Sequence, residues 1–369
     1  MTELQTNMID GLLQSMEDKM RCLSQYNHLL MEKRDSLRQK LKTKNNLRFD
    51  QWKDRSDPSQ LPKHFGVDGA MITLPAQGSS LSVVTSARVS SQNDTASING
   101  SIASIDVIPH IQVADVITRG IMTMMEMLLI DEGLSMDEEF YALMDGGRIS
   151  VLIAINMFYE AMVYHAPGLL DQWRHDASGH GRILQLFEQR DIFSRVMSSD
   201  RIMGHLKLVS TQNLVKQMQL TDMLGLIDDQ GLVNLLLEDG ESIDLPYETH
   251  GAILHMNEAF VYRDSLNQVI QKWSHHGHPW NLHHIYAKTH PFHGVYKIEV
   301  NQGMLDRIGL EACFRQWQIL CDNHEIEAPM PLYIADTLTS KVVSTMPKIY
   351  TDRIHHELGQ HPWARPYRN

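Results

Sequence analysis

The sequence predicts a mainly α-helical protein, with an N-terminal coiled-coil helix, a flexible Ser-rich arm and a globular helical body with few short strands. Three observations predict this class. A heptad pattern occupies the first 45 residues, prolines and small polar residues follow it, and apolar residues then recur at helical spacing. The predicted parts are residues 1–48, 49–104, 105–350 and 351–369, the last being a basic aromatic tail.

The N-terminal helix carries an apolar stripe that one helix cannot bury alone. Asn27 stands at an a position of the heptads, where asparagine fixes the register of a parallel pair. We therefore expect oligomerisation through Ile9, Leu13, Met16, Met20, Leu23, Asn27, Leu30 and Leu37. The alternative is that the stripe packs against a helix elsewhere in the same chain.

Basic residues gather where this helix ends. The chain has a net charge of −12, yet residues 1–57 hold 11 Lys and Arg against 9 Asp and Glu. The polyanion-binding candidates are Lys33, Arg34, Arg38, Lys40, Lys42, Lys44 and Arg48, together with Arg365 and Arg368 in the tail. A solvated helix face is the alternative. The acidic body excludes a protein that is coated with nucleic acid over most of its surface.

Residues 57–104 change in composition. Pro58, Pro62 and Pro75 are followed by a run rich in Ser, Thr, Asn, Gly and Ala, in which only Arg88 and Asp94 are charged between residues 78 and 104. Short alternations of apolar and polar residues could form edge strands when paired, but would be disordered alone. The pattern favours a linker or docking arm.

The body from residue 105 reads as a series of helices. Residues 148–165 are almost wholly apolar and end before Pro167, which predicts a helix at the centre of the core. Ser135 and Glu138 form a capping box, which predicts a short helix that ends at Gly146. Residues 297–300 predict a brief strand and residues 303–321 a further helix.

A His-rich segment is the sharpest local signal for metal chemistry, because 7 of the chain's 20 histidines lie between residues 275 and 293. The candidate ligands are His276, His278, His290 and His293, with His283 or His284 as a third. The alternative is a loop whose imidazoles pack or titrate on the surface. No H-E-x-x-H motif accompanies them, so no metal and no cofactor is predicted with a complete ligand set.

His175 and Asp176 offer a second metal candidate. In the run from Arg174 to Gly181 they resemble the His-Asp element of HD-type metal-dependent phosphohydrolases, which implies a metal site at this pair. The sequence departs from that family's pattern, since the segment before the pair is polar and His165 is too close to be the upstream ligand. The other reading is a loop between helices.

Several classes find no support in the sequence. It contains no Walker loop, no dinucleotide-binding G-x-G-x-x-G after a strand, and no G-x-S-x-G elbow. Its three cysteines cannot make a disulfide framework, which fits a reducing compartment. Neither a secretory signal nor a membrane span is expected. We expect a cytoplasmic protein, or a virion component if it is viral, with no small-molecule substrate.

This layout is similar to that of coat and nucleocapsid proteins of RNA viruses, which link copies through terminal arms. The leading hypothesis is therefore a non-enzymatic, self-assembling structural protein, a capsid or nucleocapsid protein that associates with itself and takes RNA at the basic N-terminal cluster. One alternative is a metal-dependent helical hydrolase or nucleic-acid processing factor that uses the His-rich loop. Another is a cellular coiled-coil adaptor.

Overall fold

The computed structural model describes residues 16, 20–21, 24, 28, 31–40, 42–43, 50–51, 63–76, 78–92, 95–109, 111–137, 139–206, 215–216, 227–246, 262, 282–289, 294–321 and 328–357. Its strands are β1 (Asp50–Gln51), β2 (His64–Ala76), β3 (Ser79–Gln92), β4 (Thr95–Ile108), β5 (Tyr141–Asp145), β6 (Ile202–Leu206), β7 (Glu241–Pro246), β8 (Leu282–Lys288) and β9 (Tyr296–Asn301). Its helices are η2 (Ile111–Val113), α2 (Ala114–Met136), α3 (Arg148–His165), α4 (Pro167–His175), α5 (Gly179–Gln189), α6 (Ile192–Met197), α8 (Asp229–Leu236), α10 (Gln302–Leu320) and α11 (Met330–Glu357).

The prediction of a mainly helical fold is wrong. Nine strands form one mixed sheet in the order β1-β7-β8-β9-β6-β5-β2-β3-β4. The largest error concerns the Ser-rich arm, which forms β2, β3 and β4. β2 and β3 pair without a break from His64 opposite Ser91 to Ala76 opposite Ser79. Antiparallel pairing satisfies the backbone groups of all three strands, so a segment with few large apolar residues is ordered by its neighbours.

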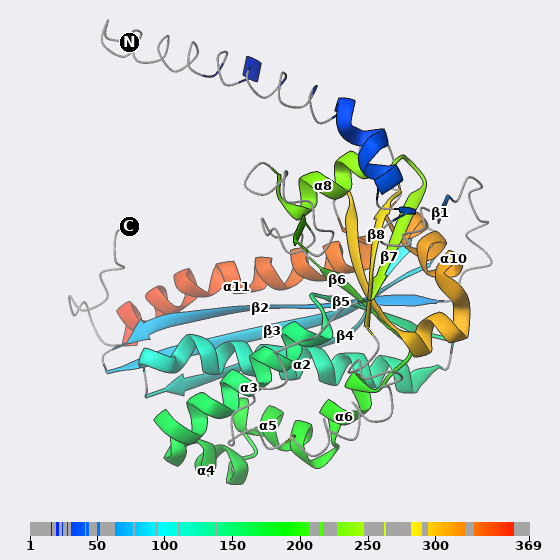
Figure 1. The fold of residues 1–369 in the computed structure, drawn as a ribbon. Coiled ribbons are helices and arrows are strands. Elements are labelled where there is room, and N and C mark those ends of the chain that lie inside the picture. The colour runs from blue at the N-terminus through cyan, green and yellow to red at the C-terminus, as the bar shows by residue number, and fades with distance from the viewer. Residues whose placement is uncertain are drawn as a thin grey trace, which may run out of the picture. The chain divides into compact units, whose positions relative to one another are not determined.

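The chain divides into two compact units, described here separately. Unit 2 comprises residues 52–207, 245–285 and 296–369. Within it, α2 and α11 cover opposite faces of β2 and β3, as Figure 1 shows. The predicted central helix is confirmed as α3, where Leu152, Ile155 and Phe158 are fully buried or nearly so.

A buried histidine ties α5 to the long strands of unit 2. The two ring nitrogens of His180 lie 2.7 Å from the hydroxyl oxygens of Ser82 on β3 and Ser104 on β4. Thr118 of α2 donates a hydrogen bond of 2.9 Å to Ser82. The ring of Trp173 packs edge-on against the imidazole. The polar atoms of this group therefore satisfy one another inside the core.

The region before α3 differs from the sequence prediction. α2 continues through Ser135 to Met136, and the residues expected to form a short helix instead form β5. β5 lies in parallel between β2 and β6, and long-range pairing of this kind decides the conformation of so short an apolar run. The predicted strand and helix after residue 296 are confirmed as β9 and α10.

Unit 1 comprises residues 1–51, 208–244 and 286–295. Its helical segment 31–40 contacts the end of α8 and the start of β7. Both Nη atoms of Arg38 donate to the carboxylate of Glu241, at 2.7 and 2.8 Å, and Arg34 donates to Glu238 at 3.1 Å. Leu37 lies between these arginines in sequence and is 6% exposed.

Leu37, one of the predicted seam residues, is buried inside unit 1 of the same chain. Pairing of the N-terminal helix between chains stays a prediction. Met16 and Met20 are exposed. The other predicted seam residues lie outside the described residues: Ile9, Leu13, Leu23, Asn27 and Leu30.

Among the described helices, no single one is long and apolar enough to cross a membrane. The bent pair α3 and α4 passes such a test by length and composition only.

Candidate active site

Two aspartates occupy equivalent positions in the register of two neighbouring parallel strands. The parallel pairing of β2 with β5 runs as far as Val67 opposite Met144. The next residues are Asp68 on β2 and Asp145, with which β5 ends. Side chains at matching positions of paired strands point to the same face of a sheet. Asp68 and Asp145 are therefore neighbours at the carboxyl end of β5.

Both aspartates face the side of the sheet that α10 and α11 cover. A Cβ added to Gly66, two residues before Asp68, would lie 2.6 Å from the backbone of α11. His205 on β6 is paired in register with Asp145, and its ring lies 5.7 Å from that of Trp317 in α10. Because Asp68 is only 7% exposed, this carboxylate is largely screened from water.

A third carboxylate comes from α2, on the other face of the sheet. Oε1 of Glu126 would lie 2.7 Å from a Cβ added to Gly69, the residue after Asp68. Glu126 is 9% exposed, so a side chain at position 69 would displace a buried carboxylate. Asp68 and Asp145 on one face of the sheet, and Glu126 on the other, therefore lie around the point where β5 ends and β2 continues.

These residues offer only carboxylate oxygens, the ligands that Mg²⁺ and Mn²⁺ prefer. Neighbouring like charges in a buried place repel one another, and a bound cation relieves that repulsion. Within the described part of the chain, no three His, Cys, Asp or Glu side chains are already close enough to enclose a metal ion. Mg²⁺ and Mn²⁺ keep water and take oxygen ligands from a phosphate, so they need fewer ligands from the protein itself. The donor set fits such an ion.

The turn after Asp145 leaves no room for side chains. Gly146 has a φ of 86°, in the left-handed region that favours glycine. A Cβ on Gly147 would lie 2.5 Å from Oε2 of Glu299. The backbone nitrogen of Gly147 donates to Oγ of Ser150 at 2.9 Å, and this hydroxyl donates to the carbonyl of Gly147 at 2.6 Å. These bonds close the first turn of α3.

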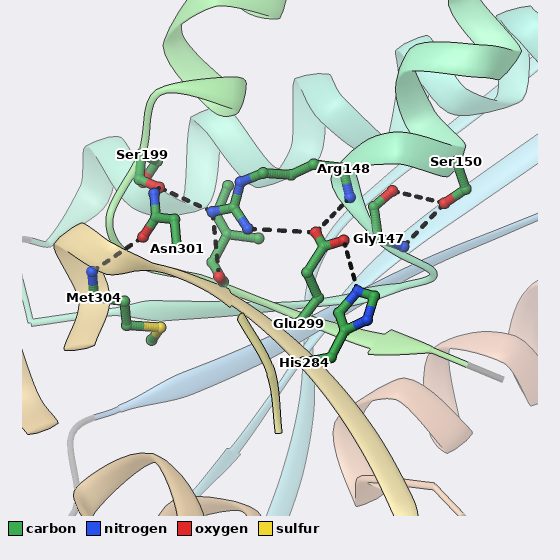
Figure 2. A network of polar contacts seen from close by, with 9 residues as sticks. Gly147, Arg148, Ser150, Ser199, His284, Glu299, Asn301 and Met304 are labelled. Atoms are coloured by element: carbon green, nitrogen blue, oxygen red, sulfur yellow. Dashed lines mark hydrogen bonds and ion pairs between the residues drawn. The ribbon is translucent and has the colours of Figure 1, made fainter. Parts of the chain in front are cut away.

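Glu299 of β9 anchors this turn (Figure 2). Its Oε1 accepts a hydrogen bond of 2.7 Å from the backbone nitrogen of Arg148 and lies 3.7 Å from Nη1 of that residue. Its other oxygen lies 3.9 Å from Nε2 of His284. Nη2 of Arg148 donates to the carbonyl of Ser199 at 2.9 Å, just before β6. The network thus joins the start of α3 to β6, β8 and β9.

The charges of this network are buried. Burial works against the charged form of Glu299, but the contact with His284 and the charge of Arg148 outweigh it, so the pKa of Glu299 lies below its ordinary value. Burial lowers the pKa of Arg148, while Glu299 opposes that shift. Each charge therefore depends on the other to remain inside the protein.

Solved structures match the fold of this protein over most of the chain. The NurA nuclease from Sulfolobus solfataricus has a TM-score of 0.59 at 13% identity, over 98% of this chain and 100% of that one. A structure of NurA with manganese has a TM-score of 0.55 at 11% identity, over 94% and 98%. A structure of NurA bound to dAMP and manganese has a TM-score of 0.50 at 10% identity, over 86% and 92%. The chain has the NurA fold.

The NurA fold overturns the leading functional hypothesis. A viral coat or nucleocapsid protein built around a helical body and a coiled coil is not what this chain forms, because its core is a nine-stranded mixed sheet of the NurA type. The alternative of a nucleic-acid processing factor agrees better with the fold. No protein-family model and no curated protein matches the sequence.

The metal site predicted in the His-rich segment stays a prediction. His276, His278, His290 and His293 lie outside the described residues. Nε2 of His283 lies 2.9 Å from the side-chain oxygen Oε1 of Gln302, and His284 belongs to the Glu299 network.

The His-Asp pair holds a helix end. Nδ1 of His175 lies 2.7 Å from the carbonyl of Asp171, and Asp176 accepts hydrogen bonds from Ser178. These bonds are typical of a turn between α4 and α5.

The polyanion candidates divide into three groups. Arg34 and Arg38 form ion pairs within unit 1. Lys33, Lys40 and Lys42 have exposed side chains and stay candidates. Lys44, Arg48, Arg365 and Arg368 lie outside the described residues.

Sequence reasoning missed all three carboxylates. Asp68 and Asp145 each follow an apolar residue and precede glycine, in Val67-Asp68-Gly69 and Met144-Asp145-Gly146. An aspartate at the end of an apolar run, with glycine after it, is a usable sign of a strand end that carries a functional side chain. Composition instead favours an arm for the first run, and a capping box favours a helix for the second. Glu126 had no local signal at all.

Proposed function

We propose that this chain is a metal-dependent nuclease that cleaves phosphodiester bonds in DNA, with Asp68, Asp145 and Glu126 as the residues that hold the cation. One observation carries the proposal. Asp68, within β2, and Asp145, the last residue of β5, follow the last residue pair of two adjacent parallel strands in a NurA fold. The solved NurA structures with manganese and with dAMP support both the cation and the class of substrate.

The roles of the residues follow from their charge and position. A divalent cation at this site would supply Lewis acidity toward a phosphoryl oxygen and would lower the pKa of bound water. Asp68 and Asp145 would hold it from one side of the strand ends, and Glu126 would hold it or its water from the other. Three carboxylates alone would repel a phosphodiester, so substrate binding is expected to require the cation.

The first turn of α11 is a candidate contact for the substrate. This turn lies against Gly66, two residues before Asp68. Its Tyr333 is 44% exposed, which is unusual for a large aromatic side chain beside a sheet. An exposed aromatic ring near cation ligands could stack on a base without selecting a sequence.

The test is DNA degradation by the purified protein with Mn²⁺, with Mg²⁺ and with a chelator. We expect cleavage that needs the metal. The rate should fall at least about 100-fold in Asp68→Asn and in Asp145→Asn, because loss of a metal ligand should lower activity more than loss of a residue that only supports a ligand. Asp171→Asn is the matched control, because Asp171 is an exposed aspartate of α4. Full activity in both variants would refute the proposal.

Two further partners were predicted from the sequence. Self-association is tested by light scattering, and RNA at Lys33, Lys40 and Lys42 by the salt dependence of binding. Neither measurement bears on the carboxylate site.

A further inference from the structure

We infer that Glu299 is a positioning residue for the candidate metal centre, which keeps Asp145 beside Asp68 by holding the turn that follows Asp145. The inference rests on the proposed function. Glu299 is paired with Gly204, whereas Asp145 is paired with the next residue of β6, His205. Adjacent strand residues point to opposite faces. Glu299 therefore faces away from the Asp145 side chain and acts through the backbone, not as a ligand.

The contacts of Glu299 hold the turn after Asp145 in a single conformation. One carboxylate oxygen accepts the backbone N–H of Arg148, three residues after Asp145, at 2.7 Å. The other oxygen fills the space where a side chain of Gly147 would be. On the side of β6, a Cβ added to Gly204 would lie 2.5 Å from the carbonyl of Gly146. The turn is thus held between β9 and β6, and the end of β5 cannot shift without breaking these contacts.

The stability of the fold alone does not require a carboxylate at position 299. A buried ion pair such as Arg148–Glu299 is often no more stabilising than apolar side chains of similar volume. A methionine at position 299 could fill the same space, but it could not accept the Arg148 N–H. The acceptor therefore serves the geometry of the turn, and that geometry is what a neighbouring metal ligand depends on.

The experiment measures Mn²⁺ binding, by calorimetry and by the electron paramagnetic resonance signal of the free ion, in the full-length protein. The variants are Glu299→Ala, Glu299→Gln and the double variant Arg148→Met with Glu299→Met. Glutamine keeps an oxygen acceptor, so we expect binding close to that of the wild type. The other two lose the acceptor, so we expect Mn²⁺ binding to weaken about 10- to 100-fold. Urea unfolding of the double variant should stay close to that of the wild type, because no buried charge is left unpaired.

Each outcome decides the inference. Wild-type Mn²⁺ binding in Glu299→Ala or in the folded double variant would overturn it, because Glu299 would then only support the fold. If the double variant does not fold, the Mn²⁺ affinities of Glu299→Ala and Glu299→Gln are compared. Equal affinities would overturn the inference. Asp68→Asn separates the two proposals: if it binds Mn²⁺ like the wild type, the metal centre itself is wrong, whatever Glu299 does.

Discussion

At the scale of single residues, position 147 shows how tightly the turn beside the candidate site is built. A methyl group there would lie 2.5 Å from Glu299 and 2.8 Å from Leu206. We expect Gly147→Ala to lower the free energy of unfolding by about 1–3 kcal/mol, since a packed site must shift to admit it. Urea denaturation measures the change.

Gly168 provides the matched control for this substitution. It lies in α4, and a Cβ added there would have no heavy atom within 4 Å. Gly168→Ala should be neutral or stabilise by up to about 1 kcal/mol, because it reduces the entropy of the unfolded chain. Equal stability of the two variants would show that the turn has more freedom than its contacts indicate.

Single residues also show why the carboxylate site escaped prediction. Asp68 and Asp145 are 77 positions apart in the numbering and become neighbours only because β5 pairs with β2. A sequence pattern can mark each strand end, but the register that joins them is a long-range property. The histidines of residues 275–293 are the opposite case, since their signal is their density in the sequence.

At the scale of elements, the attachment of α5 to β3 and β4 should depend on pH. Burial lowers the pKa of His180 to about 3, whereas a histidine in the unfolded chain titrates near 6.5. Between these values the unfolded state binds a proton that the folded state does not. Stability from this group is therefore complete above about pH 6.5 and falls by about 1.4 kcal/mol per pH unit below it.

His180→Gln isolates this effect, because glutamine keeps hydrogen-bonding groups for Ser82 and Ser104 but does not titrate. Between pH 6 and pH 4 the unfolding free energy of the variant should decline less steeply with falling pH. The difference in slope should be about 1.4 kcal/mol per pH unit, which corresponds to one bound proton. Asp106, which accepts a hydrogen bond of 3.3 Å from the backbone nitrogen of His180, is present in both proteins and cancels in the comparison. Parallel slopes would mean that His180 is protonated in the folded state.

Elements differ in how far the sequence predicts them. α3, α10 and β9 were predicted near their observed bounds, because each has a strong local pattern. β2, β3 and β4 were not, because their serines and alanines carry little apolar signal. Ser82 is completely buried in the structure, bonded to His180 and Thr118. Partners of this kind make a polar strand stable, and they come from elsewhere in the chain.

At the scale of the whole molecule, unit 1 is assembled from three separate segments of the chain. Arg38 and Glu241 are 203 positions apart, and both side chains are mostly buried. Arg38→Met would leave Glu241 buried without its partner, and we expect a loss of about 3 kcal/mol in the unfolding free energy. Arg34→Met is the control: its partner Glu238 is 53% exposed, so the loss should stay below about 1 kcal/mol. Similar losses in both variants would contradict this assignment.

The carboxylate of Glu299 has one more consequence for the molecule as a whole. The N-terminus of a helix attracts anions, because its first N–H groups point outward and its dipole is positive there. In α3 that position is taken by an anion of the chain itself, which accepts the N–H of Arg148. Sulfate, inorganic phosphate and the backbone of a nucleic acid therefore cannot bind the N–H of Arg148. An oligonucleotide that reaches Asp145 would have to be held by the cation and not by the helix behind it.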